Sequence, residues 1–144
     1  MSTEVVGFGG HGCPVATQSR QPNRRQLIGR RGEDAAVEYL TAAGWSVLDR
    51  NWRCRHGEID VVAVDPTDGD GESLVIVEVK TRTGSMFGDP AQAVTAEKYR
   101  RLRRLAGLWL ADSERHWPTI RFDVIAVHID VVGVCTVSHL RGVF

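Results

Sequence analysis

Two β-branched segments, 58–64 and 74–80, carry charged residues whose types and spacing suit hydrolytic metal chemistry: Glu58, Asp60, Glu78 and Lys80. An antiparallel hairpin centred on Gly69 places Asp60 opposite Glu78, and Glu58 opposite Lys80. Directly opposed side chains have Cβ atoms about 5 Å apart. Because the strand period is two, all four groups stay on one face even if the register slips by two residues.

Two carboxylates that face each other repel unless one is protonated or a cation lies between them. Mg²⁺ commonly takes one or two carboxylates together with water and substrate phosphate, so Asp60 and Glu78 suit it. Lys80 lies two residues from Glu78 and can position or deprotonate an attacking water. The alternative is a surface hairpin with Glu58 and Lys80 as a cross-strand pair. The apolar residues around the acids indicate burial on both faces, which favours the metal site.

An acid also lies on the apolar face of the first predicted helix, which runs from Gln26 to Ala43 and ends before Gly44. At about 100° per residue, Glu33 falls in the same arc as Ala36, Val37, Leu40 and Ala43. We therefore expect its carboxylate to face the sheet.

The second predicted helix, 91–111, carries Lys98 near the middle of its buried arc, which is formed by Val94, Leu102, Leu105, Ala106 and Trp109. Lys80 and Lys98 are the only lysines in the chain. A buried ammonium needs an anionic partner, which predicts contact with the acids or with a bound phosphate. The alternative is that Lys98 extends its ammonium to water at the helix edge.

These residues must be positioned by a helix, three strands, a second helix and two strands. The further expected strands are 45–50, 121–129 and 134–138, with turns at 56–57 and 66–72 and a loop at 84–90. This order predicts an α/β domain with a mixed central sheet flanked by helices. Residues 1–22 are expected to form a flexible tail, and residues 23–144 one domain.

The composition of the 144 residues is that of a globular protein, with 42% hydrophobic and 25% charged residues and no net charge. No apolar run is long enough to span a bilayer, and no secretory signal is evident. Three scattered cysteines argue against disulfides and zinc, and the histidines lack metal-binding spacing. We therefore expect a cytoplasmic protein without a membrane partner.

The ordered motifs Arg31-Gly-Glu, Asn51-Trp-Arg, Gly57-Glu-Ile-Asp, Val77-Glu-Val-Lys-Thr-Arg and Arg121-Phe-Asp closely resemble the YraN family of small bacterial proteins. Within them, a helical Glu, a strand Asp and a Glu-x-Lys resemble the PD-(D/E)XK nuclease pattern. The resemblance covers residues 25–130. It implies a restriction endonuclease-like core similar to that of archaeal Holliday junction resolvases.

By this resemblance Asp60 and Glu78 are metal ligands for Mg²⁺ or Mn²⁺, and the Val79 carbonyl is a further ligand. Lys80 is the catalytic lysine, and Glu33 is the helical acid that orients water. The proline of the motif's name is replaced by Ile59, and the RecB-type Gln-x-x-x-Tyr signature is absent.

The leading hypothesis is a metal-dependent endonuclease-like protein that hydrolyses DNA, including branched or structured DNA. Phosphate contacts are expected from Lys98 and from the arginines Arg53, Arg55, Arg82, Arg100, Arg101 and Arg104. Glu58 and Asp123 are assigned supporting roles, although Asp123 also suits a structural acceptor. A solvated helix face is the alternative for the arginine run.

Two other functions remain open at this point. One is a nucleic-acid-binding module that keeps the nuclease fold without cleavage, and the other is an interaction protein whose hairpin acids bind a basic partner. A homodimer is expected only by analogy with resolvases.

Overall fold

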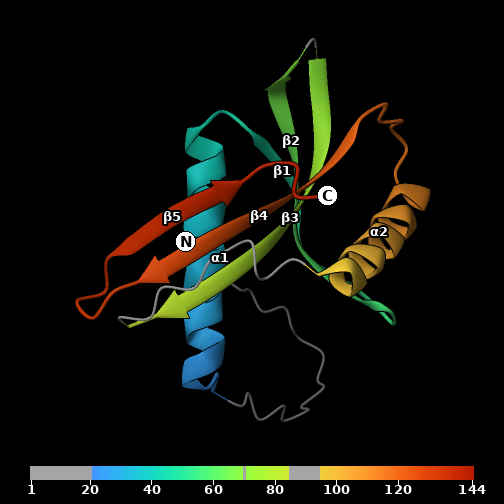
Figure 1. The fold of residues 1–144 in the computed structure, drawn as a ribbon. Helices are drawn as coiled ribbons and strands as arrows, with labels where there is room; N and C mark the ends of the chain where they lie inside the picture. Colours follow the sequence, from blue (N-terminus) through green and yellow to red (C-terminus); the bar gives the residue numbers. More distant parts are fainter. Residues whose placement is uncertain (1–20, 70, 85–94) are drawn as a thin grey trace, which may run out of the picture.

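The computed structural model describes residues 21–69, 71–84 and 95–144, and it has the predicted order of elements (Figure 1). The elements are α1 (Arg24–Ala42), β1 (Ser46–Cys54), β2 (Gly57–Asp68), β3 (Gly71–Thr83), α2 (Ala96–Ala111), β4 (Ile120–Ile129) and β5 (Cys135–Leu140). The expected tail, the loop after Gly84 and the first residues of the second predicted helix lie outside the described residues. No helix in the described part of the chain has the length and apolar character needed to cross a membrane.

The five strands form one mixed sheet in the order β1-β2-β3-β4-β5. Neighbouring strands are antiparallel except β3 and β4, which are parallel because the connection through α2 returns the chain to the same end of the sheet. Val61 pairs with Val77 and Ala63 with Val75, which is the hairpin register centred on Gly69 that the sequence predicts. A mixed α/β fold is thereby confirmed.

The two faces of the sheet pack against different helices, so the central strands are buried on both sides. On one face α1 contributes Ala36 and Leu40 to a core with Val61, Val77 and other residues of β2–β4. Figure 1 shows α1 crossing the strands on this side. On the other face α2 contributes Leu102, Leu105 and Ala106 to a second core with Val62, Val64, Leu74 and Ile76. Burial on both faces confirms the expectation from the apolar strands.

A capping box starts α1 two residues earlier than the periodicity predicts. The Asn23 side chain accepts a hydrogen bond from the Gln26 backbone N–H at 2.9 Å, and the Gln26 side chain accepts one from the Asn23 backbone N–H at 3.0 Å. This reciprocal pair satisfies two backbone donors that have no partner within the helix. The start of α1 is therefore defined by side chains rather than by its apolar face.

A close approach between Gly32 and β3 sets the distance of α1 from the sheet. A Cβ on Gly32 would lie 1.9 Å from the Thr81 hydroxyl oxygen, so only glycine fits there without movement of the strand. Gly32 precedes Glu33, and Thr81 follows Lys80. The same contact therefore brings Glu33 toward β3, the strand that carries Lys80.

The strands differ from the predictions at their ends. β2 and β3 extend through most of 66–72, which the sequence favoured as a loop, and β1 continues through Asn51 to Cys54. Ile59 packs with the α2 core and Val61 with the α1 core, so strict alternation fails at Asp60. From Gly57 to Asp60, β2 pairs only with β1. Two-stranded ribbons twist more strongly than wider sheets, and the alternation fails where this ribbon begins.

Candidate active site

The Asp60 carboxylate lies at the point where β2 separates from β3. The ladder between these strands ends at Val61–Val77, whereas the ladder between β2 and β1 continues to Gly57. Beyond the last β3 pair, an Asp60 oxygen accepts a hydrogen bond from the Val79 backbone N–H at 2.8 Å. The side chain thus takes the place of the missing strand neighbour and lies against the Glu78-Val79-Lys80 segment.

Three other acids influence the Asp60 carboxylate. Partial burial, the largest effect, raises the pKa of Asp60 to about 7, and the negative charges of Glu78, Glu33 and Glu58 raise it further against the lowering effect of the Val79 N–H. Each of these acids, which the sequence singled out, therefore lies near enough to Asp60 for its charge to act on that carboxylate. An aspartate that holds its proton near neutral pH has too little positive charge around it.

Two lysines border the acids. The Lys98 ammonium lies 3.5 Å from a Glu78 carboxylate oxygen, and both side chains are partly buried, at 30% and 17% exposure. The predicted contact of Lys98 with the acids is therefore confirmed. Lys98 lies in the first turn of α2, whose start is capped by the Thr95 hydroxyl, so the positive end of the helix also points to this side.

The surroundings of Lys80 lower its pKa, whereas those of Asp60 raise the pKa of that acid. Burial lowers the pKa of Lys80, and the positive charges of Lys98 and Arg82 lower it further, while Glu78 and Asp60 act against them. A lysine with a depressed pKa releases or accepts a proton more readily near neutral pH than an ordinary surface lysine. Lys80 is close enough to both acids and to Lys98 to feel their charges, which suits a role in proton transfer.

The donor set can be compared with the needs of a divalent cation. Within the described residues, no three His, Cys, Asp or Glu side chains are arranged to hold a metal together. Two carboxylates, a backbone carbonyl and water are nonetheless the oxygen donors that Mg²⁺ commonly takes. The raised pKa of Asp60, which comes first from burial and then from the neighbouring acids, means that a cation beside it would stabilise its charged form. In chemical type, though not as a cluster of three side chains, these donors suit a magnesium ion whose remaining ligands are water.

Glu58 does not face Lys80 as the extrapolated hairpin register predicts. Its neighbour is Arg53 on β1, with the two groups 3.0 Å apart on the protein surface. The reason is again that β2 leaves β3 before this residue, so the cross-strand partner comes from β1. Glu58 still contributes negative charge to the surroundings of Asp60.

The arginines assigned to phosphate contact all lie on the surface: Arg53, Arg55, Arg82, Arg100, Arg101 and Arg104. Those of α2 are exposed while Leu102 and Leu105 on the same helix are buried, as the predicted arc requires. Arg82 lies on the strand that carries Lys80, and Arg53 is held by Glu58. All six side chains are therefore accessible from solvent.

Asp123 belongs to a second polar cluster, which also contains Asp65, Arg121, His139 and Tyr39. The Arg121 guanidinium donates two hydrogen bonds of 2.9 Å to Asp123 and one of 3.0 Å to Asp65. His139 lies between Asp123, at 2.7 Å, and the Tyr39 hydroxyl, at 3.0 Å. None of the hydrogen bonds that Asp123 makes reaches the Asp60 group.

Sequence reasoning missed this cluster as a unit. Asp65 and Ser73 are the polar residues at the ends of the two buried strand runs, and Asp65 is fully buried. A charged residue that directly continues an apolar run, as Asp65 does after Val64, is the one local signal that could have indicated a buried acid. The identity of its partner, Arg121, depends on the packing of strands far apart in the chain.

Residues 32–127 match the model of a family described as "Uncharacterised protein family UPF0102". A UPF0102 protein of Mycobacterium sp. (strain KMS) is 53% identical over 119 residues, covering 83% of this chain and 86% of that protein. One from Mycobacterium tuberculosis is 50% identical over 122 residues, covering 83% and 93% respectively. The chain therefore belongs to the uncharacterised protein family UPF0102.

Proposed function

We propose that this protein is a metal-dependent endonuclease-like hydrolase that cleaves phosphodiester bonds in DNA, including branched or structured DNA, on a restriction endonuclease-like core. The observation that carries the proposal is the position of Asp60. Its pKa is raised among Glu78, Glu33 and Glu58 at the point where two strands separate, and it is bordered by Lys80 and Lys98. An acid without a cationic partner, beside two lysines, suits a site that receives a cation and a phosphate.

In this proposal Asp60, Glu78 and the Val79 carbonyl hold Mg²⁺ or Mn²⁺. The cation supplies neutralisation of the scissile phosphate and makes water easier to deprotonate. Lys80, with its lowered pKa, accepts or positions the proton of the attacking water. Glu33 orients that water from α1. The exposed arginines of α2 hold the DNA backbone through contacts that carry no sequence information.

A second candidate is a nucleic-acid-binding module that keeps the site without cleavage. The Lys98–Glu78 ion pair favours it, because a lysine already compensates one of the two predicted metal ligands. In this alternative the acids are structural partners of the lysines. The two candidates differ in whether a divalent cation binds and whether DNA is cut.

The deciding experiment is a panel of labelled linear, flap and four-way DNA incubated with Mg²⁺ or Mn²⁺. The nuclease proposal predicts metal-dependent cleavage that Glu78→Ala abolishes. Glu72→Ala is the matched control, since Glu72 lies on the same strand and pairs with Arg115 on the surface. Binding of DNA without cleavage in any metal, with unchanged binding in Glu78→Ala, favours the second candidate.

We propose a cytoplasmic location. The two cysteines in the described part of the chain, Cys54 and Cys135, are free thiols, which is in keeping with a reducing compartment. A homodimer is proposed by analogy with resolvases, and sedimentation velocity tests it directly.

A further inference from the structure

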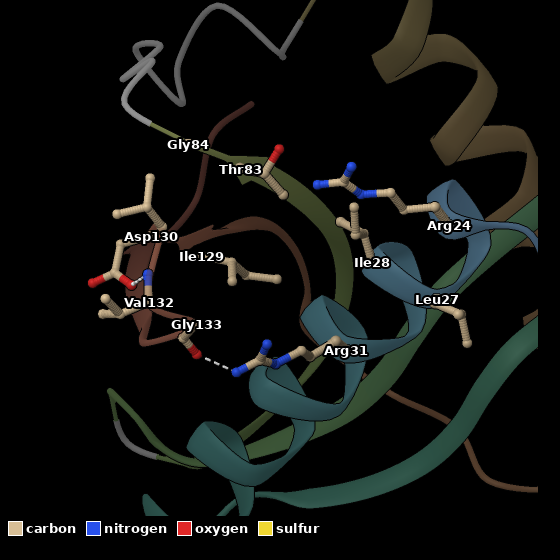
Figure 2. Close-up of a pocket in the computed structure, with 11 residues that line it drawn as sticks. Arg24, Leu27, Ile28, Arg31, Thr83, Gly84, Ile129, Asp130, Val132 and Gly133 are labelled. Carbon is tan, nitrogen blue, oxygen red and sulfur yellow. Dashed lines mark hydrogen bonds between the residues drawn. The ribbon is translucent and has the colours of Figure 1, made fainter.

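A groove separates α1 from the turn that joins β4 to β5. In Figure 2 the α1 residues Arg24, Ile28 and Arg31 lie across from Asp130, Val132 and Gly133 of the turn, with Ile129 between them. The groove has a volume of about 630 Å³, and its lining also includes Thr83 at the end of β3 and the following residue, Gly84. This volume lies within the range of about 300–1,000 Å³ that is usual for ligand sites.

The turn is held in a defined conformation although its side chains are exposed. One Asp130 carboxylate oxygen accepts hydrogen bonds of 2.9 Å from the backbone N–H groups of Val132 and Val134. The Arg31 guanidinium donates to the Gly133 carbonyl and so ties the turn to α1. The apolar groups on the turn are therefore fixed in position by the protein itself.

Aliphatic side chains are unusually exposed around this groove. Val131 is 85% and Val132 is 79% exposed on the turn, and Leu27 is 53% exposed on α1. Single exposed apolar residues are ordinary, but three around one groove form a patch of the kind that binds partners. Coverage by another apolar surface would remove them from water.

The charged residues of the groove indicate which polar groups an occupant must carry. Within the described residues, neither Arg24 nor Arg31 forms an ion pair with a carboxylate, and Asp130 is engaged by the turn backbone. The two arginines are seven residues apart on α1, which corresponds to about 10 Å along the helix. Two uncompensated guanidinium groups beside aliphatic side chains call for carboxylates on an aliphatic segment.

We propose that the groove between α1 and the β4–β5 turn is a docking site for a partner protein segment that combines aliphatic side chains with carboxylates about 10 Å apart. The aliphatic groups cover Val131, Val132 and Leu27, and the carboxylates pair with Arg24 and Arg31. A DNA backbone fits less well, because it supplies anionic groups without aliphatic ones and would meet the Asp130 carboxylate.

The docking site is distinct from the acids of the proposed nuclease site. Arg31 and Glu33 are two residues apart on α1, about 200° around the helix axis, so they point to nearly opposite sides. Glu33 lies instead beside a separate hollow lined by Arg30, Asn51 and Arg53. The proposal therefore does not depend on whether the protein cleaves DNA.

The test starts with a phage library of random dodecapeptides selected on the full-length protein and counter-selected on Arg24→Glu. We expect the enriched peptides to combine Asp or Glu with Leu, Ile or Val. Fluorescence anisotropy then measures the affinity of the enriched peptide for each variant. Arg24→Glu should weaken binding about tenfold or more, and Val132→Ser should weaken it about threefold or more.

Arg25→Glu is the matched control, because Arg25 is adjacent in sequence and exposed but does not line the groove. It should leave the affinity within about twofold of the wild type. Glu78→Ala should also bind the peptide normally, which separates this test from the nuclease proposal. Circular dichroism confirms that each variant is folded.

Three outcomes overturn the proposal. One is a selection that yields no peptides dependent on Arg24, or only peptides without acids. A second is a loss of affinity for short duplex DNA in Arg24→Glu but not in Arg25→Glu, which assigns the groove to nucleic acid. The third is a change of oligomeric state in Arg24→Glu by sedimentation velocity, which assigns the groove to a second copy of the chain.

Discussion

Asp60 on β2 and Asp123 on β4 are aspartates of the same sheet, but their surroundings act in opposite directions. Burial raises the pKa of Asp60 to about 7, and three other carboxylates add to the effect. Burial also acts to raise the pKa of Asp123, but hydrogen bonds from Arg121, His139 and the Gly142 N–H outweigh it and hold the pKa below the ordinary value. The first acid lacks a partner charge, and the second is fully satisfied.

This difference distinguishes a structural cluster, around Asp123, from a candidate binding site, around Asp60. Arg121 is held by Asp123 and Asp65, which raise its own pKa above the ordinary value, so each of these two buried acids has a cationic hydrogen-bond partner within the cluster. Such a group joins β2, β4 and β5 and needs nothing from outside. The Asp60 group is incomplete without an added cation or proton, which is the physical signature expected of a binding site.

The largest effect should come from breaking the satisfied cluster. Arg121→Met leaves Asp65 and Asp123 buried without their guanidinium partner, which should lower the free energy of unfolding by about 3–5 kcal/mol. Urea denaturation measures the change. The control Arg115→Met removes an exposed partner of Glu72 and should cost less than about 1 kcal/mol. Equal losses in the two variants would contradict the assigned roles.

The two aspartates should also give stability opposite dependence on pH. Asp60 keeps its proton in the folded protein up to about pH 7 but in the unfolded chain only to about pH 4, so its contribution falls as pH rises between these values. Asp123 has a lowered pKa, so its contribution is complete above about pH 4 and falls below it.

With a chelator present, Asp60→Asn should therefore gain stability relative to the wild type as pH rises from about 5 to 8, by about 1–3 kcal/mol. Denaturant curves at several pH values give the difference. Parallel pH profiles for the wild type and Asp60→Asn would show that the aspartate is already neutralised by other groups.

A divalent cation should reduce the stability difference between the wild type and Asp60→Asn at high pH, because it would neutralise the charged Asp60 group. Millimolar Mg²⁺ should raise the free energy of unfolding of the wild type at pH 8 by about 1–2 kcal/mol through mass action. Asp60→Asn should lose most of that gain in thermal denaturation, whereas Asp34→Asn, an exposed acid paired with Arg50 on the surface, should keep it. An unchanged melting temperature of the wild type across millimolar metal would count against the metal site.

The smallest change in stability is expected for Lys98→Met, about 1 kcal/mol or less, because methionine keeps much of the packing of the lysine stem. Its effect should instead be a loss of DNA binding or turnover. Arg101→Met, on the exposed side of α2, should cause a salt-dependent loss of DNA affinity. Normal binding and cleavage by Lys98→Met together with a defect in Arg101→Met would reverse the two roles.

Local patterns were enough to predict most of the candidate site. The β-branched runs on both sides of Gly69 predicted the β2–β3 register, and the helical arcs placed Glu33 and Lys98 toward the sheet. The predicted pairings of Asp60 with Glu78 and of Glu58 with Lys80 were both wrong, because they extended the hairpin past the last β2–β3 pair, Val61–Val77. On the Gly57 side of that pair, β2 has only β1 as a neighbour. A local pattern contains no information on where one strand leaves another.

The sequence alone determined which residues share a face, because side-chain direction repeats every two residues in a strand and every 3.6 in a helix. Only the tertiary structure decided which charges are compensated. Arg121 reaches Asp65 from a strand that follows the whole β3–α2 crossover. His139 of β5 joins Asp123 of β4 to Tyr39 of α1, which lies 100 residues earlier in the chain. Such partners are selected by long-range packing, since a buried acid is satisfied by whichever donor the fold brings within hydrogen-bonding distance.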